Sequence, residues 1–128
     1  MRAILVAALV LGGSTLACAQ NAAEGEKVFA VCRACHQIGP TAKNAVGPAQ
    51  NGLIGRAAGT YPGYAYSPAM KNSGLTWDEA TFRDYIHDPK AKVPGTKMVF
   101  PGLKDEQKIT DLIAFLKQYD ASGNKVAQ

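Results

Sequence analysis

The segment Cys32-Arg33-Ala34-Cys35-His36 brings three side chains together that could do chemistry as a unit. Two thiols three positions apart, followed at once by a histidine, match the spacing of covalent haem c attachment. One helical turn separates the thiols, so both can bond the vinyl groups of a single haem. The histidine then sits under the iron as its proximal ligand. We expect Cys32 and Cys35 to hold one haem c and His36 to bind its iron.

Other interpretations of the two cysteines explain less. A zinc site needs about four protein ligands, and only His87 is an obvious further candidate. A thioredoxin-like redox pair needs a βαβ context, which the sequence does not indicate. A secreted binding module with a Cys32–Cys35 disulfide leaves His36 without a role. Haem attachment is therefore favoured, with the disulfide module as the alternative outside haem chemistry.

Residues 1–19 have the pattern of a secretory signal peptide. Arg2 gives a basic start, residues 3–11 form an unbroken apolar run, and Ala17-Cys18-Ala19 fits a small-x-small cleavage site. The run is too short to span a bilayer, which takes about 20 apolar residues, so a retained anchor is less favoured. Lipid attachment at Cys18 is also less favoured. We expect export to the periplasm, cleavage near Ala19-Gln20, and one domain over residues 20–128.

The composition restricts the class of protein further. The 128 residues hold 14 basic and 10 acidic side chains, a formal net charge of +4. Removal of Arg2 with the signal peptide leaves 13 − 10 = +3. This small excess and the expected export argue against nucleic-acid binding. A chain of this length buries only a modest core, which a large prosthetic group would extend.

Apolar periodicity predicts an all-α fold with long loops. The clearest helix is 105–119, where apolar residues recur at spacings of three and four. Three further helices are predicted, at 22–34, 68–72 and 77–87. A capping-box pattern at Thr76 and Glu79 predicts the start of the third, and Pro89 is expected to end it. The segments 37–64 and 90–102 are expected to be loops or irregular extended chain, because glycine and proline are frequent there.

The second axial position of the iron decides between two functional classes. An open position implies peroxide or gas chemistry, and a filled one implies electron transfer. Three side chains of the mature chain could fill it, namely Met70, Met98 and His87. Spacing alone does not choose among them.

Several segments in order along residues 24–119 resemble the class I cytochromes c, in particular the bacterial cytochrome c2 and mitochondrial group. Besides the attachment segment, the resemblance rests on Gly47-Pro48, Asn51-Gly52-Leu53-Ile54-Gly55-Arg56, Lys71-Asn72-Ser73-Gly74-Leu75-Thr76-Trp77 and Asp88-Pro89-Lys90-Ala91-Lys92-Val93-Pro94-Gly95-Thr96-Lys97-Met98-Val99-Phe100. It implies a small class I cytochrome c fold wrapped around one covalent haem. The predicted signal peptide favours a bacterial periplasmic member.

The resemblance also implies roles for individual residues. Met98 would be the distal ligand, and the Pro48 carbonyl would hold the ring of His36. Five further side chains would surround the haem, three near its propionates and two near the Met98 sulfur: Arg56, Tyr66 and Trp77, then Tyr85 and Thr96.

The function implied is that of a monomeric one-electron carrier and not of an enzyme. By resemblance, the donor is a membrane quinol–cytochrome c reductase, a bc-type complex, and the acceptor is a photosynthetic reaction centre or a terminal cytochrome oxidase. A ring of lysines would steer such acidic partners by transient docking: Lys27, Lys90, Lys97 and Lys104, with Lys43 and Lys92 nearby in sequence. A small haem peroxidase or gas-binding cytochrome is the rival, and it requires that Met98 not bind the iron.

Overall fold

The computed structural model describes residues 19–127, so the predicted signal peptide lies outside the described residues except for Ala19. Two isolated β-bridges, Ala57–Thr76 and Tyr119–Lys125, occur within this range, and no strand does. The predicted all-α class is confirmed. The helices are α1 (Ala22–Phe29), α2 (Pro68–Lys71), α3 (Glu79–His87), α4 (Pro89–Lys92) and α5 (Glu106–Lys117).

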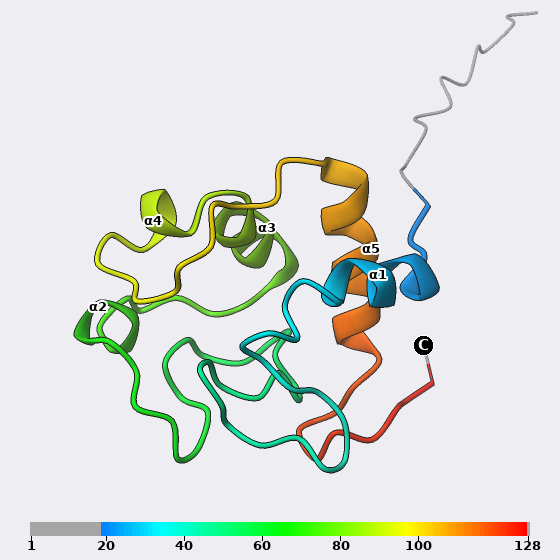
Figure 1. Cartoon of the computed structure of the whole chain (residues 1–128), viewed down its shortest axis with the longest axis horizontal. Coiled ribbons are helices and arrows are strands. Elements are labelled where there is room, and N and C mark those ends of the chain that lie inside the picture. The colour runs from blue at the N-terminus through cyan, green and yellow to red at the C-terminus, as the bar shows by residue number, and fades with distance from the viewer. Residues whose placement is uncertain (1–18, 128) are drawn as a thin grey trace, which may run out of the picture.

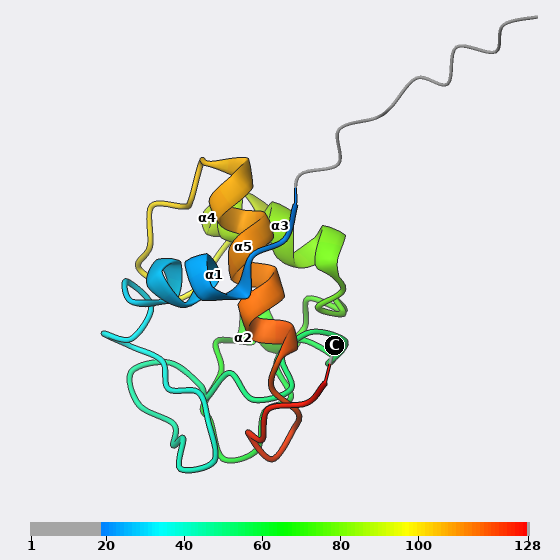
Figure 2. The ribbon, with the colours of Figure 1, turned by 90° about the vertical axis from the view of Figure 1, so that its right-hand side faces the viewer.

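The crossing of α1 and α5 is the main helix contact of the fold, and the two views show it plainly (Figures 1 and 2). Residues 109–116 of α5 are all buried, which fits the strong apolar pattern of that helix. Gly25 lies where the helices cross, because a Cβ built there would sit 1.9 Å from the backbone oxygen of Asp111. Only a residue without a side chain permits so close an approach.

Polar caps set the helix starts. The side chain of Asn21 accepts hydrogen bonds from the backbone N–H groups of Ala23 and Glu24, and thus caps α1. Each of the other helices also has a side-chain cap at its N-terminus: Ser67, Asp78, Asp88 and Asp105. These are the residue types that best satisfy the free N–H groups of a first turn.

The predicted capping box is wrong. Asp78 caps α3, and the helix begins at Glu79 and not at Trp77. Thr76 pairs with Ala57 in a β-bridge, and the backbone N–H of Trp77 donates to the carbonyl of Arg56 over 2.8 Å. This pairing holds residues 76–77 extended, so tertiary contact overrides the local capping signal.

Two other predicted bounds need correction. The first helix ends at Phe29 and not at residue 34, and turns follow it through Cys35. The segment 90–102, expected to lack helix, contains most of α4. Asp88 caps this helix by accepting from the backbone N–H of Ala91, and Pro89 suits the first helical position. The prediction that the third helix ends just before Pro89 is confirmed, since α3 ends at His87. No helix within residues 19–127 has the length and apolar character needed to cross a bilayer.

The loops between α1 and α3 form most of one side of the molecule, opposite α3 and α4 (Figure 1). The buried core draws on both sides, with Phe29 from α1, Leu53 from a loop, Phe82 from α3 and Leu116 from α5. The helices and loops thus enclose a common interior.

Replacement of Gly25 by alanine should destabilise the fold sharply. The added methyl would overlap the Asp111 backbone, and overpacking of this kind typically costs about 1–3 kcal/mol. Denaturant unfolding of the purified protein measures the change. Glu26→Ala is the control, because this exposed position lies next to Gly25 in the same helix and surface substitutions usually change the stability by no more than about 0.5 kcal/mol. Equal losses in both variants would contradict this account of the α1–α5 crossing.

Candidate functional site

A cavity of about 500 Å³ opens between the helices and the loops. That volume lies within the range of sites for cofactors and other small molecules, about 300–1,000 Å³. All nine residues predicted for the site line it: Cys32, Cys35, His36, Arg56, Tyr66, Trp77, Tyr85, Thr96 and Met98. Residues far apart in the sequence are therefore brought to one place, as the resemblance implied.

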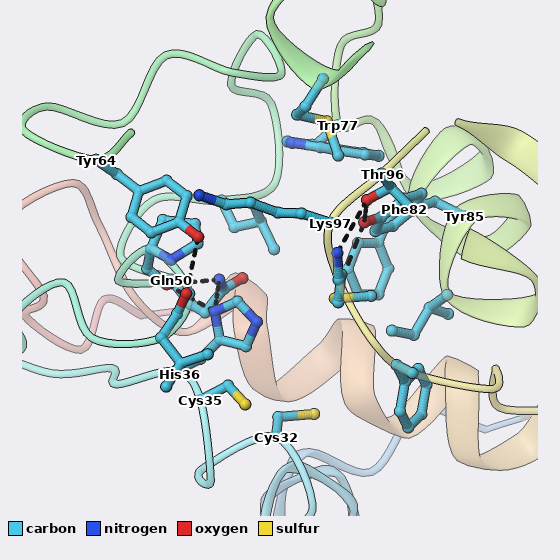
Figure 3. Close-up of a pocket in the computed structure, with 18 of the residues that line it drawn as sticks. Cys32, Cys35, His36, Gln50, Tyr64, Trp77, Phe82, Tyr85, Thr96 and Lys97 are labelled. Atoms are coloured by element: carbon cyan, nitrogen blue, oxygen red, sulfur yellow. Dashed lines mark hydrogen bonds between the residues drawn. The ribbon is translucent and has the colours of Figure 1, made fainter. Parts of the chain in front are cut away.

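One wall of the cavity carries the attachment segment. The backbone N–H groups of Cys35 and His36 both donate to the carbonyl of Cys32, over 3.0 and 2.9 Å. This tight turn presents both sulfurs and the imidazole from one side, as Figure 3 shows. Both cysteines are free thiols and half-buried. The turn places both sulfurs on the same side of the chain, which two thioether bonds to a single flat group require.

The chemistry of the Cys32 thiol argues against a redox pair. Burial, and then the neighbouring Cys35, raise the pKa of Cys32 to about 11, although Arg33 opposes the change. Redox-active cysteines have lowered pKa values, since the thiolate is the reactive form. A zinc site is not supported either, because no group of three or more potential His, Cys, Asp or Glu ligands gathers anywhere in residues 19–127.

The ring of His36 is held by the loop that follows it. Its Nδ1 lies 2.7 Å from the carbonyl oxygen of Pro48 and donates to it, which leaves Nε2 free as a ligand. Burial lowers the pKa of His36, so the neutral, metal-binding imidazole is favoured. Gly47 makes this approach possible, because a Cβ there would lie 2.2 Å from the imidazole ring.

Gln50 also touches this histidine, and sequence reasoning missed it. Its side chain is buried, with Nε2 at 2.9 Å from the Pro48 oxygen and 2.8 Å from Nδ1 of His36. Figure 3 shows the amide beside the ring. No motif singles out this position, which lies in a loop without periodicity. Only the fold reveals the contact.

The opposite wall holds Met98 in a network of hydroxyl groups. The Tyr85 hydroxyl lies 3.9 Å from the Met98 sulfur and 3.1 Å from the Thr96 hydroxyl. The backbone N–H of Met98 donates to that same Thr96 hydroxyl over 3.4 Å. Burial raises the pKa of Tyr85, so its hydroxyl keeps its proton and remains a donor.

The three candidate distal ligands differ in where they lie. Met98 and Met70 both line the cavity, and Met70 is buried in α2. His87 does not line it and lies at a separate surface hollow with Arg83 and Asp84. The structure thus removes the histidine from the set that the sequence left open.

Arg56 places a cation at the edge of the cavity between the two walls. Its Nη1 donates to the backbone oxygen of Asn51 over 2.6 Å, and its guanidinium lies 4.8 Å from the centre of the Tyr61 ring. Its Nε is buried and has no hydrogen-bond partner among the described residues. Burial lowers the pKa of Arg56, but a guanidinium stays protonated in proteins. A buried, unpaired N–H of this kind suits a carboxylate such as a haem propionate.

Two aromatic residues complete this edge. Trp77 is buried, with its ring 4.9 Å from that of Tyr85, and so connects the edge with the Met98 wall. The Tyr66 hydroxyl accepts from the backbone N–H of Tyr61 over 3.1 Å, and burial raises its pKa. The walls together fit a flat, apolar group that carries a metal at its centre and acids at its edge.

The family model described as Cytochrome c matches residues 22–120. The chain belongs to the cytochrome c family. The cytochrome is therefore an electron carrier that binds one covalently attached haem c. It is 60% identical over 126 residues to cytochrome c2 of Blastochloris viridis, covering 98% of this chain and 99% of that one. It is also 60% identical over 102 residues to cytochrome c-550 of Bradyrhizobium diazoefficiens, covering 80% and 75%.

Solved structures agree on the fold of the cytochrome. Cytochrome cH from Methylobacterium extorquens is 55% identical, with a TM-score of 0.73, covering 77% of this chain and 98% of that one. Cytochrome c2 from Rhodospirillum centenum is 42% identical, with a TM-score of 0.75, covering 78% and 98%. The predicted class I cytochrome c fold is confirmed.

Replacement of Arg56 by methionine should make the reduction potential depend on pH. A propionate next to Arg56 is expected to stay ionised, because the cation lowers its pKa. Without the cation, burial raises the pKa of this acid above the ordinary carboxyl value of about 4.3, by up to about 3–5 units if it is fully buried. Protonation then removes a negative charge near the iron, so the potential of the variant should fall as pH rises through the new pKa.

Potentiometric titration between pH 5 and 8 measures this effect. Arg56→Lys is the matched control, since it keeps the charge and should keep the potential nearly level with pH. A flat profile in Arg56→Met would show that Arg56 does not pair with a propionate.

Proposed function

We propose that the cytochrome is a periplasmic one-electron carrier whose iron is held by His36 and Met98 and whose haem is bonded through Cys32 and Cys35. It would carry electrons from a bc-type quinol–cytochrome c reductase to a photosynthetic reaction centre or a terminal oxidase. The observation that supports the ligation is the arrangement in Figure 3: His36 lies on one wall, and the Tyr85–Thr96 pair that holds Met98 lies on the other. The predicted signal peptide supports the periplasmic location.

The haem supplies the one-electron couple, and the protein keeps its surroundings constant. Pro48 fixes the imidazole, Tyr85 donates toward the Met98 sulfur, and Thr96 holds both the Tyr85 hydroxyl and the Met98 backbone. A methionine ligand paired with histidine raises the reduction potential. With both ligands held by hydrogen bonds, little has to move when the charge on the iron changes. This favours transfer of an electron over bond-making chemistry.

A carrier and not an enzyme is favoured because the cavity presents a sulfur ligand where an enzyme needs an open iron. Peroxidase or gas-binding chemistry requires an open sixth position. Met98 lines the cavity at the wall opposite His36, and the apolar residues Phe82 and Leu112 line the same cavity. The Tyr85 hydroxyl is also directed at the Met98 sulfur, so the polar group on this wall serves the thioether and not an incoming substrate.

The docking surface is proposed to be the rim of the cavity. Val99 is 95% exposed although it lines the cavity, as do the exposed Val31 and Val46. Exposed apolar side chains around the mouth of the cavity suit a brief contact with a partner protein, which would shield the haem edge from water. The surrounding lysines would supply steering toward acidic partners.

The predicted docking lysines are engaged to different degrees. Lys97 donates to the carbonyl of Ala65 and lies over the Tyr64 ring, so it also ties two loops together. Lys104 donates to the His87 carbonyl over 2.6 Å, and Lys27 pairs with Glu24. Lys90 in α4 is exposed and takes part in none of the ion pairs formed by the described residues. Lys90 is therefore the cleanest position for a test of steering.

Replacement of Met98 by alanine should open the iron while the haem stays covalently bound. The variant should bind carbon monoxide, lose the thioether-to-ferric-iron absorption band and show a lower reduction potential. Loss of a packed methionine should also lower the free energy of unfolding by about 2–5 kcal/mol. Visible spectroscopy, potentiometry and denaturant unfolding measure these changes.

Two control variants separate ligation from general damage. Met70→Leu conserves volume in the same cavity, and His87→Ala removes the remaining candidate ligand. Both variants should keep the thioether-to-ferric-iron absorption band and should not bind carbon monoxide. An unchanged spectrum in Met98→Ala would show that another residue closes the iron.

Electron transfer to an acidic partner should slow steeply with salt, because the Debye length shrinks from about 30 Å at 0.01 M to about 10 Å at 0.1 M. Lys90→Glu should lower the association rate at low salt with the potential unchanged. Lys125→Glu makes the same charge change three residues before the end of the chain and should have a smaller effect, since that end lies across the molecule from α4 (Figure 1). Stopped-flow kinetics with a reaction centre or an oxidase gives the rates. If the association rate changes neither with salt nor in Lys90→Glu, electrostatic steering is refuted.

A further inference from the structure

We propose that Gln50 is a positioning residue that raises the reduction potential by sharing the Pro48 carbonyl with His36. The inference rests on the proposed ligation of the iron by His36. It adds a residue that acts on the iron only through its histidine ligand.

The contacts form a triangle on the His36 wall. Nδ1 of His36 lies 2.7 Å from the Pro48 oxygen, and Nε2 of Gln50 lies 2.9 Å from that oxygen. The third side, between the two nitrogens, is 2.8 Å. Gln50 is 9% exposed, so its amide has few water molecules to bond to. A buried amide is costly without a partner, and the Pro48 carbonyl is the partner that the fold supplies.

Protonation states assign the direction of these bonds. An imidazole that binds iron through Nε2 carries its proton on Nδ1, so Nδ1 donates. The Gln50 amide nitrogen is also a donor. The Pro48 oxygen has two lone pairs and accepts both bonds, as a carbonyl can. Proline has no N–H, so residue 48 contributes to this triangle as an acceptor.

The contacts of Gln50 have two effects on the reduction potential, and both raise it. A carbonyl shared between two donors bonds each less strongly, so Nδ1–H is polarised less and the imidazole becomes a less basic ligand. The positive end of the amide N–H dipole also lies beside the ring. A weaker electron donor and an added positive potential both disfavour the more highly charged ferric ion. Gln50 therefore stabilises the ferrous form and raises the potential.

A purely space-filling role makes a different prediction. An amide that only fills the wall can be replaced by an apolar side chain of similar size without electronic consequence. Gln50→Leu removes the donor and keeps most of the volume. Gln50→Met does the same with an unbranched chain, and it serves if the branched leucine disturbs the wall. Gln37→Leu is the matched control, because this exposed glutamine accepts from the Lys43 backbone and makes no hydrogen bond to His36.

The experiment uses the haem-loaded protein and has two readouts. In Gln50→Leu the equilibrium between the two redox states should move toward the ferric form by roughly three- to tenfold, a fall of about 28–59 mV for a one-electron couple. In the ferrous, diamagnetic protein, the NMR signal of His36 Nδ1–H should move downfield, because its bond to Pro48 strengthens. Gln37→Leu should change neither quantity.

The outcomes separate this inference from the proposed ligation. If Gln50→Leu and Gln50→Met keep the thioether-to-iron band but leave both the potential and the Nδ1–H signal unchanged, Gln50 only fills space and the inference is wrong. A rise in potential in these variants also overturns it. If the unaltered protein shows neither an Nδ1–H signal bonded to a carbonyl nor the band, the proposed ligation itself fails.

Discussion

A cavity of about 500 Å³ lies where a domain of this size would otherwise keep the centre of its core. Buried residues of the core line it, among them Phe29, Leu53, Phe82 and Leu116, so these side chains are fully packed only when a large group occupies the cavity. The need to fill this volume is therefore the constraint on which the remaining structure depends. A haem bound there would form part of the core, next to Phe29 of α1 and to Leu112 and Leu116 of α5, which line the cavity.

The same constraint explains why binding and electron transfer use one set of residues. A group that fills the core is held from every side, and its attachments come from segments far apart in the chain. Pro48 and Gln50 reach His36 from one loop, while Tyr85 reaches Met98 from α3. Arg56 adds a buried donor at the edge. These contacts tie distant segments together around the cavity, and with the proposed ligation little would have to move when the charge on the iron changes.

Sequence reasoning succeeded where the signal is local or covalent. The thiol and histidine spacing predicted one covalent haem c, which the family membership confirms, and Cys32, Cys35 and His36 line one cavity. The apolar period of residues 105–119 predicted α5 to within two residues at its C-terminus. Sequence reasoning failed where contact with a distant segment determines the local structure. Thr76 has the pattern of a helix cap but pairs with Ala57, so Asp78 caps α3 and the helix begins at Glu79. Gln50 carries no pattern, because its importance arises only when Pro48 and His36 meet in space. Met98 was assigned through the family resemblance, since spacing did not separate it from Met70.

The central claim is that the core is completed by a covalent haem whose iron is closed on both sides. The most direct test is the visible spectrum of the unaltered, matured protein, recorded reduced and then under carbon monoxide. The account predicts a ferrous c-type spectrum that carbon monoxide leaves unchanged, with colour that acid acetone does not extract from the chain. Rapid formation of a carbon monoxide complex, or loss of the colour to the solvent, would contradict it.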